Sequence, residues 1–369
     1  MRATAGAPAQ TPPHPAAWTK EETMLVCVTG GTGFVGSHSV AAILRFGARV
    51  RILARDPAGA DRALRPLGID PAAVEVVTGD VTDAAAVARA VDGADAVLHA
   101  ASVYSFDSRR RAEMRRTNVR GTRLVLSSAV RAGADPVVHV STVGALYPTA
   151  QAAIRADSPL GMPHEAYLAS KSVAEGIARL HQEEGAPVVI TYPPALLGPH
   201  DPHLGDQNAR LRNALRGLMP VWPRGGFPVG DVRDTAELHA ELLAKPAGAR
   251  ERHFGPNRYL TTQQYVRTLR EVTGRELPAV FLPARAMLPL GALTGVLQRI
   301  WPWHIPAEHG AVYTCAHAVP VGPDVSTYGI GPRPAADTMA DTVRWLHGTG
   351  RISARQAGSA AAVPEASRA

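Results

Sequence analysis

The stretch MLVCVTGGTGFVG, Met24 to Gly36, decides the fold of this chain. Its first six residues form a short apolar run of the kind found in buried strands, and a helix is expected directly after the glycines, over 35–46. Gly30, Gly33 and Gly36 permit a tight turn, close approach of the backbone to a pyrophosphate, and close packing of helix on sheet. The start of the helix offers N–H groups and a positive dipole end to phosphates. In this strand–turn–helix setting the glycines predict a dinucleotide site.

Apolar runs and helical patterns continue to alternate after this motif. Short apolar strands separated by amphipathic helices indicate an α/β fold, with a doubly wound parallel (Rossmann) sheet covered on both faces. The expected strands are 24–29, 50–53, 74–77, 96–99, 137–140 and 188–191, and the main helices are 35–46, 83–91, 111–132 and 165–184.

After about residue 193 the alternation loosens and prolines become frequent. We therefore expect a nucleotide-binding domain over 24–193 and a smaller substrate-binding lobe over 194–348, segments of which can return to the sheet. The Ala- and Pro-rich ends, 1–23 and 349–369, are expected to be disordered. The arm has no apolar core of signal-peptide length.

The cysteine content and the apolar segments limit the classes of protein to which this chain can belong. The two cysteines, Cys27 and Cys315, lie far apart in sequence, which gives no disulfide framework or zinc-ligand spacing and fits a cytoplasmic protein without a bound metal. Residues 279–301 are apolar but interrupted by Arg285 and Pro283, which favours a helix of the substrate lobe over a membrane span.

The net charge of +7 is partly local, because seven arginines crowd one expected helix. No aromatic residues are interleaved with them, so we interpret this surface as solvated or facing a second subunit, and expect no nucleic-acid binding. These arginines are Arg109, Arg110, Arg111, Arg115, Arg116, Arg120 and Arg123.

The ends of the next strands carry further cofactor signals. Arg55, in LARDP, suits the 2′-phosphate of NADP, whereas Asp56 beside it leaves NAD open. Asp80, in TGDV, is placed to accept from an adenine amino group, with the backbone of Val81 against the ring. Small residues end the fourth strand in HAA, 99–101, and let a flat cofactor lie close.

Seven motifs in order resemble those of the extended short-chain dehydrogenases/reductases, of the NAD(P)-dependent epimerase/dehydratase type. The dihydroflavonol-reductase-like and 3β-hydroxysteroid-dehydrogenase-like branches are the most similar. The resemblance extends over about 24–345 and is carried by TGGTGFVG at Thr29, GDV at Gly79, HAA at His99, NVRGT at Asn118, VST at Val140, YLASK at Tyr167 and PPALLGP at Pro193.

This resemblance implies a set of catalytic residues. Tyr167 is the general acid or base, and Lys171, one helical turn later on the same face, lowers the pKa of the phenol and holds the nicotinamide ribose. The hydroxyl that binds the substrate oxygen comes from Thr142, with Ser141 as the alternative, and Asn118 matches a position that holds a proton-relay water. The implied cofactor contacts are Gly30, Gly33, Phe34, Val35, Gly36, Arg55, Asp80, Val81, Ala100, Ala101, Tyr167, Lys171 and Pro194.

Some residues allow two interpretations. Tyr104 follows the fourth strand and is expected either to line the substrate pocket or to pack at the surface. His99 and His139 are expected to be core histidines with satisfied hydrogen bonds. Asp234 and Glu237 have the spacing of a capping box at the start of a helix.

The resulting expectation is an enzyme that uses NADPH to reduce the carbonyl of a small substrate, or oxidises the alcohol in reverse. Two rivals stay open: a nucleotide-sugar epimerase on the same fold, and a cofactor-sensing protein without catalysis. Val143 and Gly144 stand where related dehydratases carry an acidic pair, which argues against dehydration. A homodimer through helices 111–132 and 165–184 also follows from the resemblance. The second lobe favours a hydrophobic substrate through Leu218, Met219, Val221, Trp222, Phe227, Phe281, Met287, Trp301 and Trp303.

Overall fold

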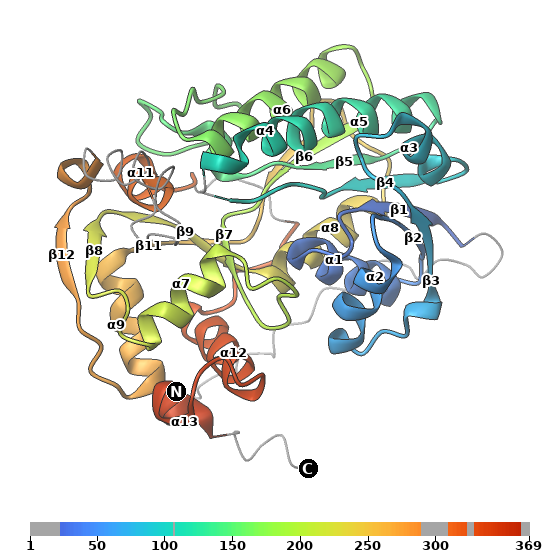
Figure 1. Ribbon diagram of the computed structural model, residues 1–369. Coiled ribbons are helices and arrows are strands. Elements are labelled where there is room, and N and C mark those ends of the chain that lie inside the picture. Colours follow the sequence, from blue (N-terminus) through green and yellow to red (C-terminus); the bar gives the residue numbers. More distant parts are fainter. Residues whose placement is uncertain (1–22, 106–107, 289–308, 323–327, 363–369) are drawn as a thin grey trace, which may run out of the picture.

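The computed structural model of the protein describes residues 23–105, 108–288, 309–322 and 328–362. Its centre is a seven-stranded sheet in the order β10-β6-β5-β4-β1-β2-β3, and all of its strand pairs are parallel (Figure 1). This confirms the doubly wound α/β fold. The strands are β1 (Leu25–Thr29), β2 (Arg49–Ala54), β3 (Val74–Thr78), β4 (Ala96–His99), β5 (Val137–Val140), β6 (Val188–Tyr192) and β10 (Arg252–Phe254).

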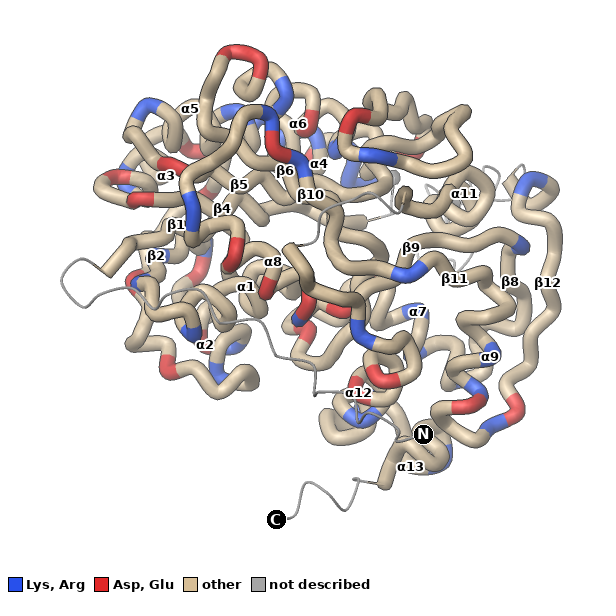
Figure 2. The backbone as a smooth tube through the Cα atoms, turned by 180° about the vertical axis from the view of Figure 1, so that it is seen from behind, with Lys and Arg blue, Asp and Glu red and all other residues tan. Residues whose placement is uncertain are grey.

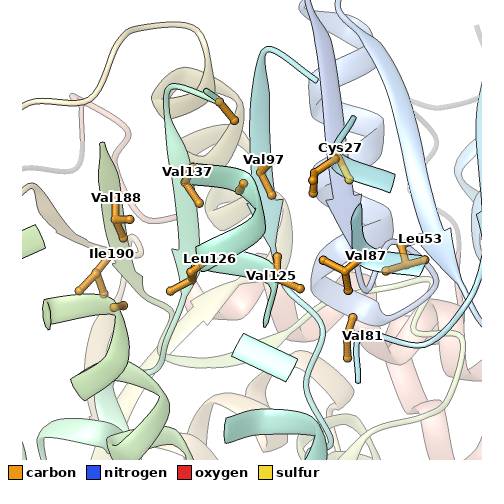
Figure 3. Packing of buried hydrophobic residues seen from close by; sticks show 14 of the residues in the cluster. Cys27, Leu53, Val81, Val87, Val97, Val125, Leu126, Val137, Val188 and Ile190 are labelled. Carbon is orange, nitrogen blue, oxygen red and sulfur yellow. The ribbon is translucent and has the colours of Figure 1, made fainter. Parts of the chain in front are cut away.

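Helices cover both faces of the sheet, as the near-continuous apolar strands require. One face carries α3 (Ala84–Val91), α5 (Thr122–Arg131) and α6 (Ala166–Glu183), and the other carries α1 (Phe34–Arg45), α2 (Pro57–Leu64) and α8 (Val232–Leu243) (Figure 1). Two layers of buried aliphatic side chains fill the space between sheet and helices. Figure 3 shows the first layer, in which Val97 and Val137 of neighbouring strands lie near Val125 and Leu126 of α5.

The long helix expected over 111–132 has an irregular centre. It consists of α4 (Arg111–Met114), a π-helical segment (Arg115–Gly121) and α5. A π-helical segment inserts an extra residue into the helical turn and is often found at functional sites. Here it contains Asn118, whose side chain is buried.

The second half of the chain forms a smaller lobe, and part of it returns to the sheet. β10 pairs with β6, and α8 packs on α1. A small sheet, in the order β11-β9-β7, lies beside a two-stranded pair, β12-β8. The elements of this lobe are β7 (Ala195–Leu197), α7 (Asp206–Leu215), β8 (Val221–Arg224), β9 (Gly226–Asp231), β11 (Arg258–Thr261), α9 (Thr262–Thr273), β12 (Val280–Pro283), α11 (His309–His317), α12 (Ala335–Gly348) and α13 (Ala354–Ala357).

Three local expectations differ from the structure. The chain after 349 is ordered as far as 362: it forms α13 and a 3₁₀ turn, and it buries Ile352, Ala357 and Ala360 in the lobe. The segment expected to be helical over 279–301 starts as strand β12 and is helical only from 284 to 288; residues 289–301 lie outside the described residues, as do the ends 1–22 and 363–369.

The third difference concerns the start of α8. Its N-cap is Asp231, whose side chain accepts from the Arg233 N–H at 2.8 Å, and not Asp234. The Asp234 carboxylate instead accepts from the Arg333 side chain at 2.6 Å. Asp234, which the local spacing predicted to cap the helix, therefore forms a long-range ion pair instead.

Charged residues of both signs are interspersed along the outer helices and loops, whereas the central strands β4, β5 and β6 carry none (Figure 2). None of the helices in the described parts of the chain combines the length and apolar composition needed to cross a membrane.

Candidate active site

A cleft of about 570 Å³ lies at the carboxyl ends of the parallel strands, where the second lobe faces the sheet. This is the edge at which open α/β sheets bind ligands. Every residue expected to contact a cofactor lines this cleft: Gly30, Gly33, Phe34, Val35, Gly36, Arg55, Asp80, Val81, Ala100, Ala101, Tyr167, Lys171 and Pro194.

The glycine turn forms the floor of one end of the cleft. Gly30 has φ +76°, and a Cβ added there would lie 2.6 Å from the Ala101 nitrogen. A Cβ on Gly36 would collide with the Gly30 carbonyl oxygen. No described side chain caps α1, so its first N–H groups are open toward the cleft. The turn therefore fits a pyrophosphate on both steric and electrostatic grounds.

Arg55 and Asp56 diverge at the end of β2. Arg55 lines the cleft. Asp56 is instead the N-cap of α2: its carboxylate accepts from the Ala58 N–H at 3.0 Å and pairs with Arg62 at 2.9 Å. Asp56, the residue that would favour NAD, is thus engaged in these bonds and does not line the cleft.

Asp80 follows β3, the strand next to β2, and it also lines the cleft. Its carboxylate accepts from both the N–H and the hydroxyl of Thr82, at 2.8 and 2.7 Å. Partial burial raises the pKa of Asp80, but these hydrogen bonds and the nearby Arg55 and Arg116 charges outweigh it and lower the pKa overall. Asp80 is therefore an ionised acceptor at neutral pH.

Tyr167 and Lys171 lie one turn apart at the start of α6, and both line the cleft. Glu165 caps this helix, since its carboxylate accepts from the N–H groups of Tyr167 at 3.0 Å and Leu168 at 2.8 Å. The Lys171 ammonium is buried and donates to the Val140 carbonyl at 2.7 Å. The cap and this bond together fix the depth of Tyr167 in the cleft.

Burial moves the pKa values of this pair in opposite directions. It raises the pKa of Tyr167, with smaller contributions from the Glu165 and Asp206 charges. It lowers the pKa of Lys171 to about 8, against the opposing charge of Glu175. The phenol is therefore protonated at neutral pH, because desolvation is the largest effect on its pKa in this cleft. The lowering of that pKa by the Lys171 ammonium stays a prediction.

The two neighbouring hydroxyls at the end of β5 have different partners. Ser141 is buried and donates to the Glu175 carboxylate at 2.7 Å. Thr142 begins a 3₁₀ turn and accepts from the Gly144 N–H at 3.3 Å, which leaves its own proton available to donate. Both line the cleft, and the geometry favours Thr142 over Ser141 as the hydroxyl for a bound oxygen.

Tyr104 lies in the cleft wall, not at the protein surface. Its ring packs edge-on against the Tyr167 ring, with centroids 4.7 Å apart. Its hydroxyl accepts from the Gln207 amide at 3.2 Å, so it joins the sheet to α7 of the second lobe.

Asn118 lies behind the wall and does not line the cleft. Its side-chain oxygen accepts from the Val103 N–H at 2.7 Å and the Ser102 hydroxyl at 3.1 Å. Its amide nitrogen donates to the Val103 carbonyl and the Ser170 hydroxyl. These bonds tie the loop after β4 to α6, and the proton-relay water stays a prediction.

The core histidines differ from one another. His99 bonds to the Thr29 hydroxyl at 2.7 Å and the Thr122 hydroxyl at 2.9 Å. His139 stacks on His99, and neither of its ring nitrogens has a hydrogen-bond partner among the described residues. The expectation of satisfied bonds is therefore met by His99 and is wrong for His139.

Sequence reasoning missed three residues near the site. Arg110, expected on a surface that is solvated or faces a second subunit, lines the cleft, as does Gln207 of the second lobe. Phe227, one of the apolar residues expected to favour a hydrophobic substrate, lines the cleft too. Glu175, two turns after Tyr167 on the same face of α6, is fully buried beneath them. The spacing of Tyr167, Lys171 and Glu175 at i, i+4 and i+8 was the available signal for Glu175. Arg110 and Gln207 reach the cleft through contacts between distant segments. Within the described residues no group of three His, Cys, Asp or Glu side chains is arranged to hold a metal.

Comparisons with known proteins agree with this geometry. The profile described as the NAD dependent epimerase/dehydratase family matches residues 26–255. Sterol demethylase protein B of Methylococcus capsulatus is 30% identical over 89% of this chain and 100% of its own length. Cinnamoyl-CoA reductase 1 of Oryza sativa is 31% identical over 69% of this chain and 77% of its own. Among solved structures, a dTDP-glucose 4,6-dehydratase of Streptomyces venezuelae with NAD and TYD bound is 27% identical, with TM-score 0.66 over 88% of this chain and 97% of that one.

Proposed function

Because this chain belongs to the NAD dependent epimerase/dehydratase family, we propose that it is an NADP-dependent reductase of a hydrophobic carbonyl compound. One observation carries the proposal. A single cleft joins the glycine turn, the Tyr167–Lys171–Thr142 group and an apolar wall of the second lobe that includes Phe227.

The choice of NADP over NAD rests on charge at the end of β2. Asp56 is engaged by the start of α2 and by Arg62, whereas Arg55 lines the cleft. Arg110 lines the cleft too, paired with Glu113 at 2.8 Å, and the charge of Arg55 also acts on Glu113. Two guanidinium groups near one ribose site favour a cofactor with an additional phosphate.

The chemistry follows from the protonation states. When bound, the reduced cofactor supplies a hydride to the carbonyl carbon. Tyr167 holds the proton that the carbonyl oxygen then receives, because its raised pKa keeps the phenol protonated. Thr142 donates to the same oxygen and stabilises its developing charge. Lys171 stabilises the phenolate left on Tyr167 until that group recovers a proton from solvent.

The lining of the second lobe favours an uncharged substrate. This lobe contributes the apolar residues Leu196, Phe227 and Pro228 to the described cleft wall, together with the polar residues Asp201, His203, Gln207 and Asn208, but no arginine or lysine. None of the four arginines of this lobe that could bind a nucleotide diphosphate, Arg210, Arg212, Arg216 and Arg224, lines the described cleft. Arg212 donates to Asn213 and Arg216 to the Arg351 carbonyl, whereas Arg210 donates to Gln207, which does line it. The relatives named for a sterol and for a cinnamoyl group also support a substrate with an apolar ring.

A panel of aryl ketones, aldehydes and UDP-sugars tests the proposal. We expect NADPH absorbance to fall with one or more of the carbonyl compounds, and the matching alcohol to appear. Isomerised UDP-sugar with no net change in the cofactor would instead establish an epimerase. Tight NADPH binding with turnover of neither group would support the non-catalytic alternative.

A further inference from the structure

Glu175 is a buried carboxylate that the proposed chemistry does not use. Its side chain is fully buried on α6, yet its two oxygens receive four hydrogen bonds. The donors are the Ser141 hydroxyl at 2.7 Å, the Tyr192 hydroxyl at 2.7 Å, and two guanidinium nitrogens of Arg179 at 2.6 and 2.9 Å. Burying a carboxylate costs free energy unless it is paired, and these four hydrogen bonds offset that cost.

These bonds tie the catalytic helix to the catalytic strand. Lys171 and Glu175 occupy successive turns of α6, and their partners, the Val140 carbonyl and the Ser141 hydroxyl, are successive residues of the chain. Thr142 comes next on that chain, and Tyr167 lies one turn earlier on the helix. Two buried bonds therefore set the distance between the two groups that would bind the substrate oxygen.

We propose that Glu175 is a positioning residue of the active site, which holds the end of β5 against α6 and supplies the counter-charge of the Lys171 ammonium. This inference rests on the proposed function for its catalytic meaning, but the charge relation can be tested without turnover.

The surroundings of Lys171 support the second role. Burial lowers its pKa to about 8, and the Glu175 charge acts against burial. The other titratable groups around it are His99 on β4 and His139 on β5, on which its charge acts, and Tyr167, one turn earlier on α6. Burial lowers the pKa of both histidines and raises that of the tyrosine, so all three are uncharged at neutral pH. Among the described residues Glu175 is thus the carboxylate that keeps Lys171 protonated.

Arg179 gives a test with opposite signs. Replacing Glu175→Gln keeps the shape and removes the negative charge, so the Lys171 titration midpoint is expected to fall by about one pH unit, the low end of the effect of an opposite charge nearby. Replacing Arg179→Met removes the cation that offsets Glu175, so the midpoint is expected to rise. Tyr192→Phe is the matched control, because it removes a hydrogen bond to Glu175 without changing any charge, and the midpoint is expected to stay in place.

The chain is suited to this measurement, because Lys20, Lys171 and Lys245 are its only lysines. Titration of ¹⁵N-lysine-labelled protein by NMR, with Lys171→Arg to assign the resonance, reports the midpoint directly in the full-length protein. The pH profile of kcat/KM for NADPH-dependent reduction is expected to move in the same two directions.

Two results would overturn the inference: an unchanged Lys171 midpoint in Glu175→Gln, or an unchanged midpoint in Arg179→Met. A carboxylate that only stabilises the fold would change the unfolding free energy in both variants and move neither midpoint. If Glu175→Gln does not fold, Arg179→Met still decides, because removing the guanidinium changes the charge of this group whether Glu175 stays ionised, so that the midpoint rises, or takes up a proton, so that it falls. Failure of the parent protein to reduce any carbonyl would refute the proposed function and leave the titration result valid.

Discussion

Four buried histidines make the stability of this protein depend on pH. His38, His99, His139 and His239 are all buried, and burial is the largest cause that lowers the pKa of each: to about 4 for His38 and about 3 for His99 and His239, and in the same direction for His139. In the unfolded chain each titrates near the ordinary value of about 6.5. Below that pH the unfolded state therefore binds protons that the native state does not.

The sign and size follow from this difference. The contribution of these histidines to stability is fully present above about pH 6.5 and is lost as the pH falls, by about 1.4 kcal/mol per pH unit for each histidine. At about pH 5 that is roughly 2 kcal/mol for each one. Domains are typically stable by only about 5–15 kcal/mol, so four such groups are enough to bring the protein close to unfolding.

The perturbation that isolates one of them is His239→Gln. His239 bonds to the Ser39 hydroxyl at 2.9 Å and the Thr191 hydroxyl at 3.1 Å, and none of these three residues lines the described cleft. Urea unfolding of parent and variant, followed by circular dichroism between about pH 7.5 and pH 5, gives the slope of unfolding free energy against pH. The variant is expected to be less stable, with a slope lower by about 1.4 kcal/mol per pH unit because one titrating group has gone. Equal slopes in the two proteins would refute the reasoning, whatever their absolute stabilities.

Three further predictions concern the cleft. Tyr167→Phe is expected to lower kcat by roughly 10²–10⁴-fold while NADPH affinity, measured by fluorescence, stays close to that of the parent, because only the proton donor is lost; parent-like turnover would contradict the proposed chemistry. Arg55→Ala is expected to weaken NADPH binding by about tenfold and leave NADH binding unchanged, since a hydrogen bond to a charged group is worth about 1.5–3 kcal/mol and the lower value corresponds to about tenfold in affinity. Equal affinities for the two cofactors in the parent would exclude this role of Arg55. Tyr104→Leu is expected to reduce kcat/KM for an aryl ketone by about two- to tenfold, because an aromatic contact is lost. Tyr104→Phe is the control, since it keeps the ring and removes only the hydroxyl that Gln207 contacts. An equal loss of kcat/KM in both variants would assign the effect to the hydroxyl.

The central sheet was predictable because its signals are local. Each expected strand of the first half is a short apolar run with turn residues on both sides. The glycine turn after β1 marks the carboxyl-terminal edge of the sheet, at which the cleft forms. The positions of Tyr167, Lys171 and Thr142 along the cleft follow from that topology, since residues after parallel strands meet at one edge.

What could not be predicted depends on contacts between distant segments. Asp234 has the local spacing of a cap, but Arg333, almost one hundred residues later, binds it instead. The tail after 349 is rich in alanine and reads as disordered, yet Ala357 and Ala360 fill space in the second lobe. The sequence around His139 is that of an ordinary core histidine. Its ring lacks a hydrogen-bond partner among the described residues because the pairing of β4 with β5 stacks it on His99.

The place of β10 at the edge of the large sheet has a consequence for any attempt to divide this protein. A fragment that stops at residue 193 would leave the backbone groups of β6 without their neighbour and would strip α8 from α1. Chimeras that exchange the substrate half with a relative should therefore keep residues 232–254 from the same parent as the glycine turn. During synthesis, likewise, the cofactor half cannot complete its own sheet until the ribosome has moved well into the second half of the chain.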